Sequence, residues 1–132
     1  MLKKKIFDLT GFEFDGKIKE TEFDGVYVSY DGKDATIGYS TKVQKARCYF
    51  LLSMKIKNGE KQFEIKEKLN LDSCTLSVDV SRNGVLNIPA TKKLLTYLAS
   101  IGLTGLSLYM EDVFEVEGHP YFGYMRGRYS YD

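Results

Sequence analysis

The sequence predicts an α+β chain with a small antiparallel sheet and a covering helix, followed by the first βαβ unit of an incomplete (β/α)8 barrel. Within residues 1–70, short alternating segments surround an Asp-Gly turn and one stretch with helical spacing. Residues 71–132 contain a strand, a helix and a second strand, and polar residues follow each strand directly. We therefore expect an α+β domain at 1–70 and the start of a barrel at 71–132.

Several strands are expected in the first part. Residues 3–9 (KKKIFDL) have the composition of an edge strand, where lysines discourage pairing with other chains. Residues 25–30 and 34–39 alternate apolar and polar side chains on either side of the Asp-Gly turn at 31–32, and this dipeptide is a strong hairpin signal. Residues 61–66 (KQFEIK) alternate again. These segments predict the small antiparallel sheet.

One helix is expected to cover this sheet. Apolar residues recur at helical spacing between residues 41 and 57. Thr41 is a suitable N-cap, and Asn58-Gly59 provides a stop. The apolar positions of this helix are Val43, Ala46, Phe50, Leu51 and Met54.

The second part begins after a polar stretch at 66–73, which is typical of a linker. A short strand, a helix with Pro89 in its first turn and Gly102 at its end, and a second strand follow. This order predicts a right-handed crossover between two parallel strands. A complete barrel needs roughly 250 residues, so the chain is expected to hold only the opening unit. The apolar positions are Leu76, Val78 and Val80 in the first strand, Leu94, Leu95, Leu98 and Ile101 in the helix, and Leu106, Leu108 and Met110 in the second strand.

Composition argues against several classes of function. Hydrophobic residues make up 43% of the 132 residues, which is enough for a core. The 19 basic and 18 acidic residues give a net charge of +1, so nothing favours nucleic acid as a partner. Cys48, Cys74 and His119 fit no metal-site spacing, and we expect neither a metal nor an organic cofactor. No apolar stretch approaches the roughly 18 residues of a membrane span, so we expect no membrane partner and a cytoplasmic location.

Distinct motifs follow both strands of the second part. The first strand ends in DVSRN (79–83), and the second continues as LYMED (108–112). A longer motif, EGHPYFGYMRGRY, lies at 117–129. Together these motifs resemble the start of the catalytic barrel of family 20 glycoside hydrolases, the β-N-acetylhexosaminidases, and in particular the bacterial branch specialised for terminal N-acetylglucosamine. Residues 1–70 are similar in layout to the noncatalytic α+β domain that precedes that barrel.

The resemblance implies an enzyme that removes terminal N-acetylglucosamine or N-acetylgalactosamine from glycans without a cofactor. The substrate's own acetamido group assists the hydrolysis in that family. An Asp-Glu pair near the end of the fourth barrel strand orients this group and donates the proton, and the sequence contains no such pair. We therefore expect no catalytic residue here, and an N-terminal fragment that is itself inactive. The alternative is a self-standing noncatalytic module that binds carbohydrate or protein.

Three residues are candidates for contact with the sugar. By resemblance, Arg82 matches the arginine that holds hydroxyls of the terminal sugar, and the fixed donors of a guanidinium suit adjacent hydroxyls. The alternative for Arg82 is pairing with Asp79 or with neighbouring backbone. Glu111 and Asp112 follow the second strand, where barrel enzymes place polar function, but structural hydrogen bonding is an equal alternative. Adjacent carboxylates on an extended chain point to opposite sides, so these two are not expected to act as a pair.

The aromatic C-terminal segment and the open strands predict further contacts. The aromatic rings can stack on sugars, or they can pack against later elements of the barrel. His119 is expected to be a loop residue. Parallel strands with uncovered faces and open edges are expected to make the chain self-associate. The aromatic residues of this segment are Tyr121, Phe122, Tyr124, Tyr129 and Tyr131.

Overall fold

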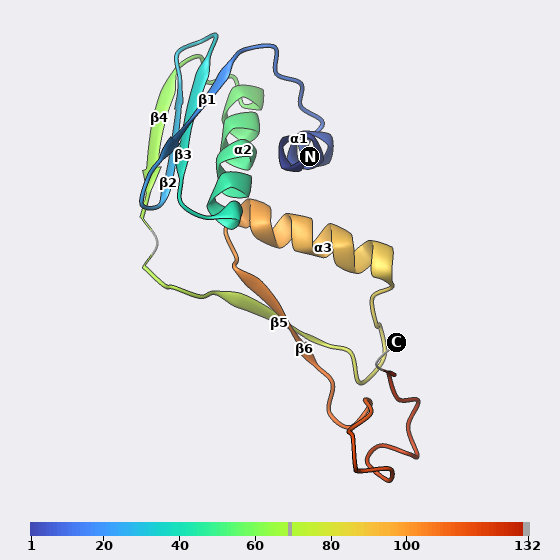
Figure 1. The fold of residues 1–132 in the computed structure, drawn as a ribbon. Coiled ribbons are helices and arrows are strands. Elements are labelled where there is room, and N and C mark those ends of the chain that lie inside the picture. The colour runs from blue at the N-terminus through green and yellow to red at the C-terminus, as the bar shows by residue number, and fades with distance from the viewer. Residues whose placement is uncertain (69, 131–132) are drawn as a thin grey trace.

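The computed structural model describes residues 1–68 and 70–130. Within these residues, three helices and six strands form two parts, a mixed four-stranded sheet with helices on one side and a two-stranded sheet with its own helix (Figure 1). The fold is therefore α+β, as predicted. The elements are α1 (Leu2–Thr10), β1 (Ile18–Glu22), β2 (Val26–Tyr30), β3 (Ala35–Tyr39), α2 (Lys42–Lys57), β4 (Phe63–Glu67), β5 (Thr75–Asp79), α3 (Ile88–Ile101) and β6 (Gly105–Tyr109).

The four-stranded sheet has the order β1-β3-β2-β4. The hairpin of β2 and β3 is antiparallel as predicted, and so is the pairing of β4 with β2. At the other edge, β1 runs parallel to β3, so the prediction of a purely antiparallel sheet is wrong. The sequence of β1, IKETE, has one apolar residue and four exposed positions, so alternation gave no signal for this strand.

Residues 3–9, predicted as an edge strand, lie in helix α1 instead. A strand would place the neighbouring residues Ile6 and Phe7 on opposite faces, whereas the helix buries both of them. The Phe7 ring packs edge-on against Tyr49 of α2, with ring centroids 5.7 Å apart. The helix ends at Gly11, whose left-handed backbone (φ 59°) is easily adopted by glycine. Burial of both Ile6 and Phe7 therefore explains why this segment forms a helix and not a strand.

Helix α2 is the helix predicted at 41–57, and both of its ends are confirmed. Thr41 is the N-cap, since its hydroxyl accepts a hydrogen bond from the Gln44 backbone N–H (3.2 Å) while the Gln44 side chain accepts one from the Thr41 N–H (2.9 Å). Asn58 is the C-cap. Burial spreads around the helix because the sheet, α1 and α3 all contact it, and Met54 remains 36% exposed. The buried residues of α2 are Gln44, Ala46, Cys48, Tyr49, Leu51, Leu52 and Ser53.

The main core lies between the four-stranded sheet, α1 and α2 (Figure 1). Alternate side chains of β2 and β3 are buried in it, as the period of two predicts. Intervening residues stay on the other face, where the Tyr27 hydroxyl donates to Glu64 (3.1 Å). The core residues are Ile6, Phe7, Val26, Val28, Ala35, Ile37, Ala46, Cys48, Tyr49, Leu51 and Leu52.

The predicted strand–helix–strand unit is present in the second part. Strands β5 and β6 are parallel and α3 connects them. Pro89 lies in the first turn of α3, and Gly102 ends the helix in a left-handed conformation (φ 93°), as predicted. Each strand has one neighbour among the described residues. Large apolar side chains remain uncovered on this unit, including Leu76 (37% exposed) and Leu108 (48% exposed).

Arg47 of α2 connects the two parts. Its guanidinium pairs with Glu67 at the end of β4, with Nη2 2.8 Å from Oε1 and Nε 3.0 Å from Oε2. Its Nη1 donates to the carbonyl of Ser100 in α3 at 3.4 Å, and Ser100 is fully buried. The predicted linker at 66–73 overlaps the end of β4, and its Leu69 lies outside the described residues. The two parts are thus joined through α2 as well as through the chain.

Glu20 holds the edge strand β1 to α2. Its carboxylate accepts hydrogen bonds from Lys45 Nζ (2.6 Å), from the Tyr49 hydroxyl (3.0 Å) and from the Tyr39 hydroxyl. The hydrogen bonds from Lys45 and Tyr39 lower the pKa of Glu20. Burial, together with the hydrogen bond to Glu20, raises the pKa of Tyr49 to about 12. This network anchors a strand that has little apolar surface of its own.

The network predicts a pH dependence of stability. The pKa of Glu20 is lower in the folded state than in the unfolded state. The ionised Glu20 carboxylate therefore adds to the free energy of unfolding above the unfolded pKa of about 4.3. This contribution is lost as the pH falls through the lower pKa of the folded state. Glu20→Gln should therefore lower the free energy of unfolding at pH 7, and the difference from wild type should shrink as the pH approaches 3. Urea unfolding at a series of pH values measures this difference.

The matched control is Glu22→Gln on the same strand, because no hydrogen bond or ion pair involves the Glu22 side chain among the described residues. A difference between wild type and Glu20→Gln that stays constant from pH 7 to 3 would show that the Glu20 charge does not anchor β1.

Candidate functional site

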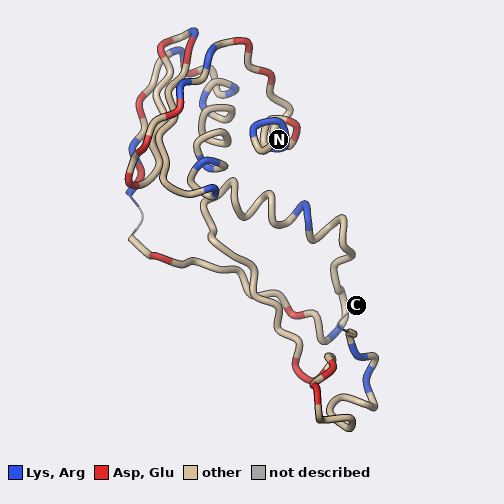
Figure 2. The backbone as a smooth tube through the Cα atoms, in the orientation of Figure 1, with Lys and Arg blue, Asp and Glu red and all other residues tan. Residues whose placement is uncertain are grey.

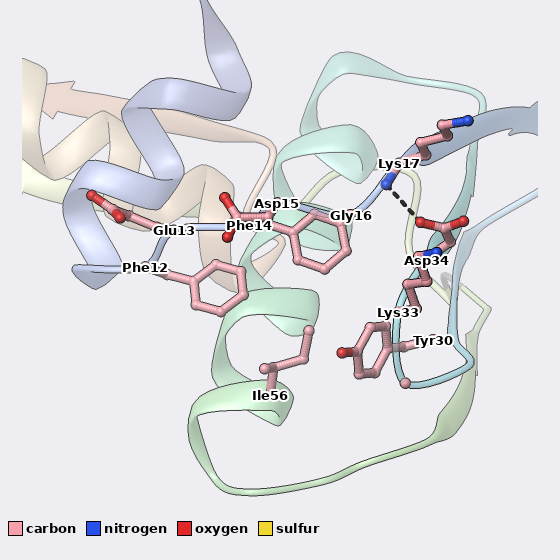
Figure 3. A pocket seen from close by; sticks show the side chains of 11 residues that line it. Phe12, Glu13, Phe14, Asp15, Gly16, Lys17, Tyr30, Lys33, Asp34 and Ile56 are labelled. Carbon is pink, nitrogen blue, oxygen red and sulfur yellow. Dashed lines mark hydrogen bonds between the residues drawn. The ribbon is translucent and has the colours of Figure 1, made fainter.

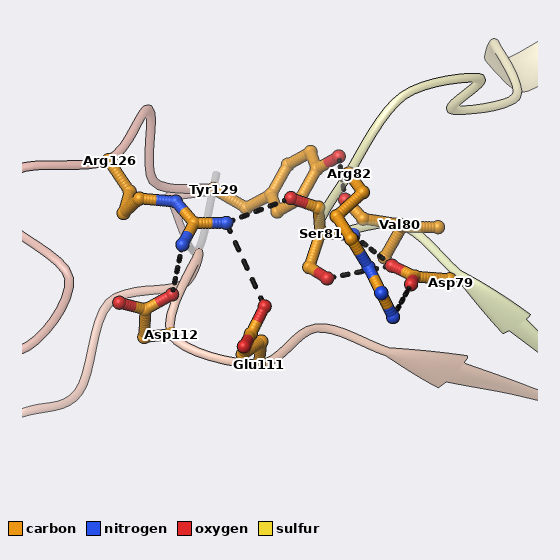
Figure 4. A network of polar contacts seen from close by, with 8 residues as sticks. All are labelled: Asp79, Val80, Ser81, Arg82, Glu111, Asp112, Arg126 and Tyr129. Carbon is orange, nitrogen blue, oxygen red and sulfur yellow. Dashed lines mark hydrogen bonds and ion pairs between the residues drawn. The ribbon is translucent and has the colours of Figure 1, made fainter.

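The candidate site lies at the carboxyl ends of β5 and β6. Because the two strands are parallel and Asp79 is in register with Tyr109, the segments that follow them emerge side by side. Residues 79–82 lie at and just after the end of β5, and residues 110–112 directly follow β6. The segment from 113 to 130 then folds back to contact the ends of both strands (Figure 4). Carboxyl ends of parallel strands are where α/β folds place functional groups. The topology therefore brings the three predicted site residues to one edge.

Arg82 pairs with Asp79 and is otherwise turned to solvent. The ion pair joins Arg82 Nη2 to Asp79 Oδ2, and the Arg82 side chain is 70% exposed. Its guanidinium carbon lies 6.0 Å from the centroid of the Tyr109 ring. The structural alternative given for Arg82, pairing with Asp79, is thus confirmed. A single carboxylate leaves donors of the guanidinium free for a ligand, so contact with a sugar stays a prediction.

Asp79 is the best-held carboxylate of the site. Its Oδ1 accepts hydrogen bonds from the Ser81 hydroxyl (2.7 Å) and the Ser81 backbone N–H (2.8 Å). These bonds, together with Arg82, lower the pKa of Asp79. Asp79 is therefore ionised at neutral pH and is suited to orienting Arg82 rather than to donating a proton.

Glu111 and Asp112 face the same cation, Arg126. Asp112 Oδ1 lies 3.2 Å from Arg126 Nη1, and Glu111 Oε2 lies 3.8 Å from Arg126 Nη2 (Figure 4). The expectation that these adjacent carboxylates point to opposite sides is wrong, because the chain is not extended here. Glu111 has a positive φ of 49°, which turns the backbone directly after β6.

Arg126 was not predicted to belong to this site. Its Nη2 also donates to the Ser81 carbonyl (3.0 Å), so it contacts the segments after both strands. Nearby, the Tyr129 hydroxyl donates to the Val80 carbonyl (3.0 Å). Its position in the sequence did not indicate these contacts, because Arg126 lies well after the ends of both β5 and β6. The only signal was its place inside the motif at 117–129.

The segment after β6 folds back compactly. The Tyr129 N–H donates to the Val113 carbonyl (2.8 Å), and Val113 is buried. Gly123 has φ 61°, and a Cβ added there would lie 1.8 Å from the Asp112 carbonyl oxygen, so the fold-back requires glycine at this position. Phe122 packs on Phe114 of the same segment, with ring centroids 5.3 Å apart. Packing of the aromatic residues against later elements of a barrel stays a prediction.

The remaining predicted residues of this segment lie in the open. Tyr121 and Tyr124 are exposed and pack edge-on against each other, with centroids 6.0 Å apart. His119 is an exposed loop residue, as expected. Tyr131 lies outside the described residues. Stacking of the two exposed tyrosine rings on a sugar stays a prediction.

The arrangement provides hydrogen-bond donors and fixed charges. Within residues 1–68 and 70–130, no group of three His, Cys, Asp or Glu side chains could hold a metal ion. The hydrogen bonds from Ser81 lower the pKa of Asp79, which favours its ionised form. Such a site can bind a polar ligand through the donors of Arg82 that Asp79 does not occupy.

A separate hollow of about 470 Å³ lies in the first part of the chain, away from the candidate site. It is located between the segment after α1 and the β2–β3 turn. Phe12, Phe14, Tyr30 and Ile56 surround it, whereas the Glu13 and Asp15 carboxylates are turned away from these apolar groups (Figure 3). The acid at its rim, Asp34, accepts a hydrogen bond from the Lys17 backbone (2.8 Å). The hollow therefore lacks the convergent polar groups of a specific site.

Comparisons with known proteins add no assignment. No protein-family model matches the chain, and no curated protein matches it either. Across the described part of the chain, no helix has the length and apolar character needed to cross a membrane.

Proposed function

We propose that the chain is the N-terminal portion of a β-N-acetylhexosaminidase, which removes terminal N-acetylglucosamine or N-acetylgalactosamine by substrate-assisted hydrolysis. The observation that carries this proposal is the parallel β5–α3–β6 unit with Arg82, Glu111 and Asp112 gathered at its carboxyl ends. The motifs at 79–83 and 117–129, which resemble that family, supply the substrate class. On this proposal, residues 1–70 are its noncatalytic domain and residues 71–132 begin its catalytic barrel.

The uncovered apolar surface of the second part supports a barrel over a self-standing module. Parallel sheets are normally covered on both faces and continue into further strands. Here Leu76 and Leu108 are exposed on the strands, and Leu95 and Ile101 are exposed on the helix between them. Additional barrel strands and helices would bury these side chains, whereas an independent binding module of this size would be expected to bury them itself.

In the proposed enzyme the described residues bind and orient the sugar. Arg82, oriented by Asp79, would donate hydrogen bonds to adjacent hydroxyls of the terminal ring. Glu111 and Asp112 would accept hydrogen bonds from hydroxyls on the other side of the site, since carboxylates are acceptors when ionised. The Asp-Glu pair that assists the acetamido group would come from later strands, so residues 1–132 alone would be inert.

The test is hydrolysis of 4-nitrophenyl N-acetyl-β-D-glucosaminide by the full-length protein that contains this chain and by the 132-residue chain. We expect turnover by the former and only the blank rate from the latter. Arg82→Ala in the full-length protein should lose about 2–3 kcal/mol of transition-state binding, seen in kcat/KM, because charge-assisted hydrogen bonds to the sugar disappear. Lys92→Ala, an exposed lysine on α3, is the matched control.

Two results would contradict the proposal. Turnover by the purified 132-residue chain would place the catalytic acid within it. A full-length protein that binds N-acetylglucosamine without hydrolysing any N-acetylhexosaminide would support the alternative, a noncatalytic carbohydrate-binding module.

We further propose that the 132-residue chain self-associates in isolation. The free edges of β5 and β6 and the exposed Leu76 and Leu108 offer backbone groups and apolar surface to a second copy. Light scattering across a range of concentrations should give a mass that rises from the monomer to a dimer or beyond. Leu108→Lys should shift the mass toward the monomer, whereas Ser107→Lys, on the opposite face of β6, is the control. A wild-type monomer at every concentration would contradict self-association.

A further inference from the structure

Arg126 links the ends of both parallel strands through one rigid group. Its Nη2 lies 3.0 Å from the Ser81 carbonyl after β5, and its Nη1 lies 3.2 Å from Asp112 after β6. Its Nη2 is also 3.8 Å from Glu111. A guanidinium is planar, so its contacts fix the separation and relative orientation of the groups it joins. We call Arg126, Ser81, Glu111 and Asp112 the Arg126 clamp.

We propose that Arg126 is a positioning residue that sets Glu111 and Asp112 at a fixed place relative to Arg82. The inference rests on the proposed function, because it concerns the sugar site between these side chains. Arg82 follows Ser81 directly, so the hydrogen bond to the Ser81 carbonyl ties Arg126 to the backbone that carries Arg82. The clamp thereby relates the donor side of the site to its acceptor side.

The charges of the clamp explain why a cation is needed at this position. Glu111 and Asp112 are adjacent acids, and the turn that brings them together places Glu111 at a positive φ of 49°. Without Arg126, repulsion between the two carboxylates and the backbone strain at Glu111 would favour a different turn. The Arg126 side chain is 39% exposed, so each ion pair adds little to stability. The expected consequence of the clamp is therefore geometric rather than stabilising.

Arg128 provides a contrast within the same motif. Its Nη1 donates to the carbonyls of Pro120 (3.3 Å) and Phe122 (3.0 Å), which belong to its own segment. No hydrogen bond or ion pair of Arg128 reaches a strand end among the described residues. The two arginines therefore make different contacts. Arg128 hydrogen-bonds within the segment after β6, whereas Arg126 connects this segment to the residues that follow β5 and β6.

The first test uses the 132-residue chain and does not depend on activity. Hydrogen–deuterium exchange should show that Arg126→Ala removes protection from amides at both strand ends, namely those of Val80 and Val113, which are hydrogen-bonded to the Tyr109 and Met110 carbonyls. Arg128→Ala should remove protection only within 117–126. Unchanged protection at Val80 in Arg126→Ala, or identical patterns in the two variants, would overturn the clamp.

The second test measures kinetics of the full-length protein on 4-nitrophenyl N-acetyl-β-D-glucosaminide. Arg126→Ala should reduce kcat/KM roughly 10- to 100-fold, because small displacements of binding groups are costly to the rate, with KM raised and the unfolding midpoint nearly unchanged. Arg126→Lys keeps the charge but loses the planar fork, so it should recover only part of the loss. Wild-type kinetics in Arg126→Ala would overturn the positioning role.

The two tests separate failure of the clamp from failure of the proposed function. If the wild-type full-length protein hydrolyses no N-acetylhexosaminide while Arg126→Ala loses protection at both strand ends, the clamp stands as a structural link but its role in a sugar site is overturned. If the enzyme is active and Arg126→Ala behaves like Arg128→Ala in both tests, the proposed function stands and the inference about Arg126 is overturned.

Discussion

The contact of Arg47 with Glu67 and Ser100 is the interaction on which the arrangement of the molecule depends. It joins α2, the end of β4 and α3 at one point, with distances of 2.8 Å to the Glu67 carboxylate and 3.4 Å to the Ser100 carbonyl. Ala99 of α3 also packs against the core that α2 shares with the sheet. Docking of α3 on α2 therefore places β5 and β6, and with them the segments that form the candidate site.

Once α3 is docked on α2, the parallel arrangement of β5 and β6 determines where the candidate site lies. Figure 2 shows acidic and basic residues together at the carboxyl ends of β5 and β6, whereas the strands leading to them carry few charges. Parallel strands bring Arg82 and Asp112 to the same edge although they are distant in sequence, and Arg126 then ties the two segments together. The site thus presents fixed charges from the ends of two strands at one edge of the sheet.

Much of the fold could be predicted because its signals are local. The Thr41 cap of α2 and the Gly102 end of α3 are each encoded by one residue type at one position. The secondary-structure predictions were wrong where tertiary contacts, and not local sequence, determine the structure. Burial of Ile6 made a helix from a lysine-rich segment, and strand β1 is fixed by the hydrogen bonds of Glu20 rather than by an apolar pattern. Arg126 was missed for the same reason, because its partners lie far away in sequence.

Hydrogen–deuterium exchange of the wild type and of Arg47→Ala tests most directly whether α2 positions the second part. If it does, Arg47→Ala will lose amide protection in α3, β5 and β6 while β2 and β3 keep theirs. Lys55→Ala, also on α2, removes the ion pair with Glu60 just after the helix (2.8 Å) and should leave both parts protected. Undiminished protection of α3, β5 and β6 in Arg47→Ala, or an equal loss throughout the chain, would contradict a specific role of this contact.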